Sequence, residues 1–160
     1  MRPATDGPEI TPLQAEQVLD ALSEIVSRAA QATLAIPFSS VAHRMKKDMS
    51  PVTAADEASE ALILAGLACL LPGVPVIAEE SVGNAPKGPL GPSFLMVDPL
   101  DGTKEFLAGR DEFTVNVALV TNGIPIAGII AAPAQGLLWR GGVWATGPGK
   151  GCKSSPVTGA

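Results

Sequence analysis

An apolar run that ends in two closely spaced aspartates is the feature that most constrains the fold of this 160-residue chain. The stretch FLMVDPLDGTKEF, residues 94–106, predicts a strand that leads directly into a turn containing Pro99 and Gly102. Burying an unpaired carboxylate is costly, so Asp98 and Asp101 need a cation, a proton or a basic side chain to compensate them. The stretch therefore predicts a functional turn at the end of a buried strand.

Two helices are predicted before this turn. Thr11 as the cap, Pro12 at the first helical position and Gln14 as the capping-box partner predict a helix over residues 12–35. Thr53, with Asp56 three residues later, predicts a second helix that ends before Pro72 and Gly73.

The second helix shows an apolar repeat at helical spacing. Its members, which we expect to form the buried face, are Ala58, Leu62, Ala65 and Cys69. Cys69 is then a buried free thiol rather than half of a disulfide or a metal ligand, because neither cysteine lies in a CxxC motif. This pattern is consistent with a reducing cytoplasm.

Several strands complete the pattern. VPVIAEES predicts a short strand ending in Glu79 and Glu80, and Asn122–Gly123 predicts a hairpin between two strands, with a third after Pro133. The order predicts an α+β fold with layered helices packed on a mainly antiparallel sheet. We expect one domain over residues 1–146 and a flexible tail over residues 147–160, which lack a periodic apolar pattern.

The charge balance narrows the classes of partner. The net charge is −5, with 16 acidic and 11 basic residues, which argues against a nucleic-acid polymer or an anionic membrane surface. The N-terminus lacks the apolar core of a signal peptide, and prolines and glycines interrupt the longest apolar stretch. We therefore expect no transmembrane segment.

Carboxylates follow three predicted element boundaries: Asp56 at a helix start, Glu79 and Glu80 after one strand, and Asp98 and Asp101 after another. Hard oxygen ligands without imidazole or thiolate point to Mg²⁺. The alternative is that these are solvated turn residues that cap local structure. The haloacid dehalogenase motif D-x-D-G-T does not apply, because D-P-L-D-G-T is one residue longer and no βαβ unit surrounds it.

The segments VDPLDGTKEF, IAEES and SPVTAAD resemble the N-terminal motifs of the inositol-monophosphatase-like, lithium-sensitive, Mg²⁺-dependent phosphatases. The K-E-F after D-G-T, followed by EFTVNVALV, most resembles the bacterial 3′(2′),5′-bisphosphate nucleotidase branch (CysQ type). The resemblance covers about residues 12–147 and implies the N-terminal half of an αβαβα fold. It also implies direct attack of water on adenosine 3′,5′-bisphosphate, a by-product of sulfate assimilation, to give AMP and phosphate.

The resemblance also implies a role for each matching residue. The metal-ligand positions are Glu79, Asp98, Asp101 and the Leu100 carbonyl group. Asp56 would help to hold a weaker metal and the water network, Thr103 would orient the attacking water, and Glu80 would steer it. The Gly102 and Thr103 amides would meet the substrate phosphate.

The resemblance stops at the C-terminal side. Family members continue for about another domain, which carries a W-D-x-A-A motif that neither Trp139–Arg140 nor Trp144–Ala145 matches. We therefore expect the N-terminal half of such an enzyme, without the family's C-terminal domain. The alternatives are a weakly active or inactive metal-binding remnant, a module that self-associates through an exposed sheet, and an inositol or histidinol phosphate phosphatase relative.

Overall fold

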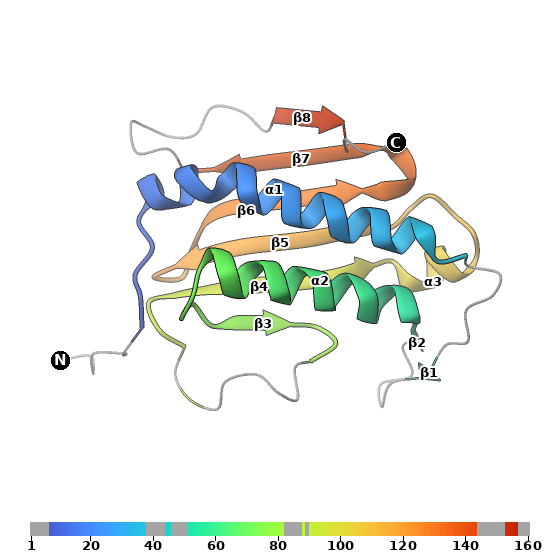
Figure 1. The fold of residues 1–160 in the computed structure, drawn as a ribbon, viewed down its shortest axis with the longest axis horizontal. Coiled ribbons are helices and arrows are strands. Elements are labelled where there is room, and N and C mark those ends of the chain that lie inside the picture. Colours follow the sequence, from blue (N-terminus) through green and yellow to red (C-terminus); the bar gives the residue numbers. More distant parts are fainter. Residues whose placement is uncertain are drawn as a thin grey trace.

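Two long helices lie side by side across one face of a six-stranded sheet (Figure 1). The computed structural model describes residues 7–37, 44–45, 51–81, 88, 90–143 and 153–156. The helices are α1 Pro12–Ala35, α2 Ala54–Leu70, α3 Thr103–Leu107 and the short 3₁₀ turn Pro133–Gln135. The strands are β1 Arg44–Met45, β2 Pro51–Val52, β3 Val76–Ala78, β4 Ser93–Asp101, β5 Thr114–Thr121, β6 Ile124–Ala132, β7 Leu137–Gly142 and β8 Lys153–Pro156.

The sheet is mixed but mainly antiparallel, which confirms the predicted α+β class. Its order is β3-β4-β5-β6-β7-β8, and β3 alone runs parallel to its neighbour, β4. β1 and β2 form a separate antiparallel pair. β8 lies within the range for which we expected a flexible tail, and there it pairs with β7.

The predicted helix starts and the predicted hairpin are confirmed. Thr11 and Gln14 form a capping box at α1, and Thr53 and Asp56 form one at α2. In the hairpin between β5 and β6, Asn122 and Gly123 both have positive φ angles, of 52° and 79°. Two successive positive values match the turn that joins right-twisted strands, which explains the Asn-Gly sequence.

The predicted buried face of α2 is wrong. Leu62 and Cys69 are exposed, whereas the buried residues are Ala55, Asp56, Ser59, Glu60, Ile63 and Leu67. Polar side chains belong to the buried stripe because strand ends supply hydrogen-bond partners for them. The thiol of Cys69 consequently faces solvent.

Both helices pack on the same side of the sheet. α1 lies across β5, β6 and β7, while α2 lies against β4 (Figure 1). The core between the layers includes Leu22, Ile63, Leu95 and Ile129. Within the described ranges, no helix is both long and apolar enough to cross a membrane. The opposite sheet face is left without a helical layer from the described residues.

Candidate active site

A β-bulge places the two motif aspartates at the same edge of the sheet. In an uninterrupted strand, residues three positions apart point to opposite faces. The register of β4 against β5 shifts between Asp98 and Asp101, and the two residues between them, Pro99 and Leu100, are both buried. The bulge thus buries two successive apolar residues and keeps both carboxylates off the helix-covered face.

Gly102 is required by its backbone conformation and by its surroundings. Its φ of 93° lies in the left-handed region, and a Cβ atom there would lie 2.8 Å from the backbone oxygen of Glu112. Directly after it, Thr103 begins the short helix α3, which Phe106 anchors by an edge-to-face contact with Phe113, 5.2 Å between ring centroids. The tight turn therefore fixes where the Thr103 hydroxyl group lies.

Asp56 connects the start of α2 to this turn. Its side chain is completely buried, and its Oδ2 atom accepts hydrogen bonds from the Thr53 amide at 2.8 Å and hydroxyl group at 2.6 Å. Its Oδ1 atom lies 3.0 Å from the Thr103 hydroxyl oxygen, which is also 3.2 Å from the Leu100 carbonyl oxygen. Thr53 therefore fixes the Asp56 carboxylate group through Oδ2, and the other oxygen orients Thr103.

Asp98 lies in an electrostatically unfavourable position. Its pKa is raised from 3.8 to about 7, first by burial and then by the negative charge of Glu79, a hydrogen bond with the Glu79 side chain, and the charge of Asp101. A backbone hydrogen bond at Leu100 opposes this rise. Among the described residues, Asp98 Oδ1 is a buried side-chain oxygen without a hydrogen-bond partner. A hard cation would satisfy this oxygen and relieve the repulsion.

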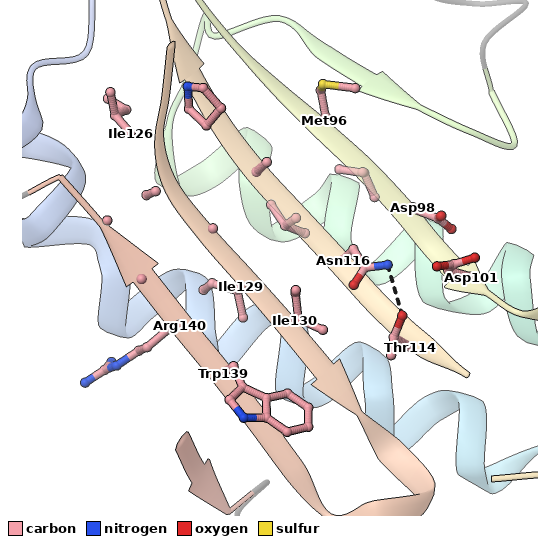
Figure 2. A pocket seen from close by; sticks show the side chains of 18 of the residues that line it. Met96, Asp98, Asp101, Thr114, Asn116, Ile126, Ile129, Ile130, Trp139 and Arg140 are labelled. Carbon is pink, nitrogen blue, oxygen red and sulfur yellow. Dashed lines mark hydrogen bonds between the residues drawn. The ribbon is translucent and has the colours of Figure 1, made fainter. Parts of the chain in front are cut away.

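A cavity of about 1080 Å³ lies over the open sheet face and reaches these carboxylates. Figure 2 shows Asp98 and Asp101 at one end of β4, beside Asn116 and Thr114 of β5, whose side chains share a 3.1 Å hydrogen bond. The rest of the lining is mostly apolar and includes Met96, Ile130, Trp139 and the small residues Ala118, Gly128 and Gly141. The cavity thus has an acidic end and an apolar floor.

The predicted site residues fall into two neighbouring groups. Glu79, Asp98 and Asp101 line the cavity, while Asp56, Thr103 and the Leu100 carbonyl group are linked by hydrogen bonds at the α2 end. Glu80 does not line the cavity, and its amide bonds to Glu60. No three acidic, imidazole or thiol side chains of the described residues are close enough to hold a metal ion as they stand. A cation would have to draw the carboxylates together.

Sequence reasoning missed four polar residues of this region. Ser59 donates to the Pro99 carbonyl oxygen at 2.7 Å, and Glu60 accepts from the Glu80 amide at 2.9 Å. Thr114 and Asn116 lie opposite Asp101 and Asp98 in the register of β4 and β5. The alternation in TVNVALV would have placed Thr114 and Asn116 on one face, and the i, i+3, i+4 spacing of Asp56, Ser59 and Glu60 would have placed those three on another.

Comparison with known proteins identifies related chains. The inositol monophosphatase family matches residues 10–156. The 3′(2′),5′-bisphosphate nucleotidase CysQ of Escherichia coli (strain K12) is 46% identical over 94 residues, covering 59% of this chain and 38% of that protein. The protein of the same name from Aggregatibacter actinomycetemcomitans is 33% identical over 127 residues, covering 78% of this chain and 47% of its own length.

Solved structures show the same fold. CysQ from Bacteroides thetaiotaomicron, described as a bacterial member of the inositol monophosphatase family, matches with a TM-score of 0.64 and 30% identity, covering 88% of this chain and 49% of that one. Inositol monophosphatase from Anabaena matches with a TM-score of 0.69 and 27% identity, covering 87% and 47%. The chain therefore spans less than half of the length of each of these relatives.

Proposed function

Because this chain belongs to the inositol monophosphatase family, we propose that it carries the water-positioning and metal-binding part of a phosphatase of the 3′(2′),5′-bisphosphate nucleotidase type. Sequence identity supports this substrate class: it is 46% over 94 residues with the Escherichia coli CysQ protein and 30% with the Bacteroides CysQ structure, against 27% with the Anabaena inositol monophosphatase structure. The proposed reaction converts adenosine 3′,5′-bisphosphate to AMP and phosphate. Lithium sensitivity and a place in the cytoplasm belong to the same proposal.

The proposed cation is Mg²⁺, held by Glu79, Asp98, Asp101 and the Leu100 carbonyl group. This donor set fits because its oxygens are hard ligands and because Asp98 Oδ1 is buried and accepts no hydrogen bond from the described part of the chain. When bound, Mg²⁺ lowers the pKa of a bound water and neutralises charge on the leaving oxygen. The raised pKa of Asp98 supports the assignment, since repelling carboxylates are a common feature of functional sites.

The observation that carries the proposal is the hydrogen bond between Thr103 and Asp56. A hydroxyl group has one proton, and when Thr103 donates it to Asp56 or to the Leu100 carbonyl group, its lone pairs remain available to accept from water. Thr103 would then hold a water molecule in a defined orientation beside the Asp56 carboxylate group. Glu80 is proposed to assist in steering that water.

The start of α3 is proposed to meet the transferred phosphate. The amides of Gly102 and Thr103 come at the beginning of the helix, where backbone N–H groups have no acceptor within the helix. The apolar floor of the cavity offers a separate surface for the rest of the substrate or for another part of the protein.

Phosphate release tests the proposal directly. The chain is assayed with adenosine 3′,5′-bisphosphate, inositol 1-phosphate and histidinol phosphate, each with Mg²⁺, with Mg²⁺ and lithium, and with EDTA. We expect Mg²⁺-dependent release that is greatest with adenosine 3′,5′-bisphosphate and is reduced by lithium. Preference for inositol 1-phosphate would instead favour the inositol phosphatase alternative, and release in EDTA would contradict the proposal.

A further inference from the structure

Glu60 is a buried carboxylate that the proposed chemistry does not use. It lies on α2 and is only 6% exposed. Its Oε2 atom accepts a hydrogen bond from the Glu80 amide at 2.9 Å, and its Oε1 atom accepts one from the Ser81 hydroxyl group. No basic side chain of the described residues pairs with it. Both of its oxygens therefore hold the turn that follows β3.

This turn carries Glu79, which lies beside Asp98. The amide of Glu79 bonds to the Val97 carbonyl oxygen at 3.1 Å, and the amide of the next residue bonds to Glu60. β3 has only three residues, and the bond from the Glu79 amide continues its ladder with β4 by one residue. Beyond Glu79, the hydrogen bonds to Glu60 hold the next two residues of the turn.

Glu60 repeats a pattern made by two other residues of the same helix. Asp56 bonds to the Thr103 hydroxyl group, and Ser59 bonds to the Pro99 carbonyl oxygen. These two anchor the bulge and turn after β4, while Glu60 anchors the turn after β3. One face of α2 thus makes hydrogen bonds to both of the turns that bear the site carboxylates.

A buried carboxylate at position 60 lowers the stability of the fold relative to an apolar side chain. Burial of a charge without an opposite charge is unfavourable, and an apolar side chain of similar volume is often better for stability. The benefit lies in geometry, since two charge-assisted hydrogen bonds fix two successive residues of one turn.

We propose that Glu60 is a positioning residue that holds the turn of Glu79, Glu80 and Ser81 so that the Glu79 carboxylate is placed for cation binding with Asp98. This inference rests on the proposed function for its metal, but the hydrogen bonds on which it depends can be tested without metal. Partners that orient metal ligands typically affect affinity by about 10–100-fold.

The test compares Glu60→Met with wild type in two measurements. Methionine fills a similar volume but accepts neither hydrogen bond. We expect the Glu80 amide in the metal-free protein to exchange its hydrogen at least about tenfold faster, the loss of roughly one hydrogen bond. We expect affinity for Mn²⁺, followed by its electron paramagnetic resonance signal, to fall by about 10–100-fold. Glu60→Gln, which keeps one acceptor oxygen, should recover part of both losses.

Two further variants control the experiment. Glu16→Met makes the same change at an exposed position of α1 and should leave both measurements at wild-type values. Ser81→Ala removes one of the two bonds to Glu60 without altering the core, and should give a smaller loss in Mn²⁺ affinity. Ser81→Ala decides the question if Glu60→Met does not fold, and wild-type affinity in it then overturns the proposal.

The outcomes separate the inference from the proposed function. In a folded Glu60→Met variant, an unchanged exchange rate at Glu80 or an unchanged Mn²⁺ affinity overturns the positioning role. A wild-type chain that binds no Mn²⁺ contradicts the proposed metal site instead. In that case the exchange rate of the Glu80 amide decides by itself whether Glu60 holds the turn.

Discussion

The Thr103 hydroxyl oxygen lies 3.0 Å from the buried Oδ1 atom of Asp56, a residue 47 positions earlier in the chain. The other oxygen of Asp56 is occupied by Thr53, so this carboxylate has no freedom to rotate. Its contact with Thr103 therefore couples the start of α2 rigidly to the start of α3. The orientation of one hydroxyl group depends on the packing of a whole helix.

Thr103→Val should damage both activity and stability. Valine has nearly the same shape but cannot donate to Asp56, which leaves a buried carboxylate oxygen unsatisfied at a cost of about 1–3 kcal/mol. Loss of a group that orients water should lower kcat on the order of 10²–10³-fold. Urea unfolding and phosphate release measure the two effects. Thr103→Ser should retain most of each, and equal damage by serine would contradict the role of the hydroxyl group.

Asp98→Asn should bind Mg²⁺ much more weakly than wild type in calorimetric titrations. The substitution removes the negative charge of Asp98, which we propose binds the cation, and it keeps the size of the side chain. Glu16→Gln, at an exposed position of α1, is the matched charge control and should bind as wild type does. Equal heats from Asp98→Asn and wild type would refute a shared site of Glu79, Asp98 and Asp101.

Without divalent cations, the stability of the fold should fall as pH rises from about 4 to 7. The pKa of Asp98 is near 7 in the folded state and 3.8 in its ordinary state, so the folded chain holds a proton that the unfolded chain releases in this range. The contribution of Asp98 to the free energy of unfolding is thus most favourable at low pH, and it is lost as the pH rises through about 7. Thermal unfolding in EDTA at several pH values measures it.

Asp98→Asn serves as the control for that experiment. Relative to wild type, it should be more stable in EDTA at pH 8, and the difference should shrink as pH approaches 4. Added Mg²⁺ should stabilise wild type more than Asp98→Asn at pH 8. Parallel pH profiles for the two proteins would show that Asp98 is not the responsible group.

The open sheet face should promote association between copies of the chain. Met96 and Ile130 on this face are 49% and 47% exposed, and large exposed apolar patches are typical of interaction sites. We expect dimers or larger species on a sizing column and binding of a hydrophobic dye. Ile130→Lys should shift the protein toward monomer and weaken dye binding. A wild-type monomer that binds no dye would contradict this prediction.

The 160-residue chain should bind Mg²⁺ but turn over adenosine 3′,5′-bisphosphate more slowly than the Escherichia coli relative. The match covers 38% of that protein, so the 160 residues assayed correspond to only part of the relative. Loss of one electrostatic group typically costs on the order of 10²–10³ in rate, and weaker positioning adds to this. Both proteins are assayed side by side at saturating Mg²⁺, and equal, lithium-sensitive rates would refute the expectation.

Local sequence signals predicted much of the fold. Thr11, Thr53 and the Asn122–Gly123 turn act through hydrogen bonds and backbone angles within a few residues, so their effect is visible in a short window. The D-P-L-D-G-T turn is of the same kind, since Gly102 and the residues around it determine where the chain bends.

The buried face of α2 could not be predicted from such windows. Asp56, Ser59 and Glu60 are buried because their partners lie on β4 and on the turns after β3 and β4. Hydrophobic periodicity assigns polar residues to the solvent-exposed face. The sequence therefore predicted that Leu62 and Cys69 would be buried. Where an apolar stripe of a helix continues into polar residues at the same spacing, the hydrogen-bond partners of those residues in the rest of the fold determine which face is buried.

The anchors on α2 have a consequence for the order of folding. The hydrogen bonds of Glu60, Ser59 and Asp56 to the strand ends span 20, 40 and 47 residues. Each closes a long loop of chain, and such loops form late because their entropy must be lost before the contact is gained. The helix itself forms from local contacts within microseconds. During refolding, the contacts that create the site should therefore form after α2 itself, so the appearance of the site should lag behind the appearance of the helix.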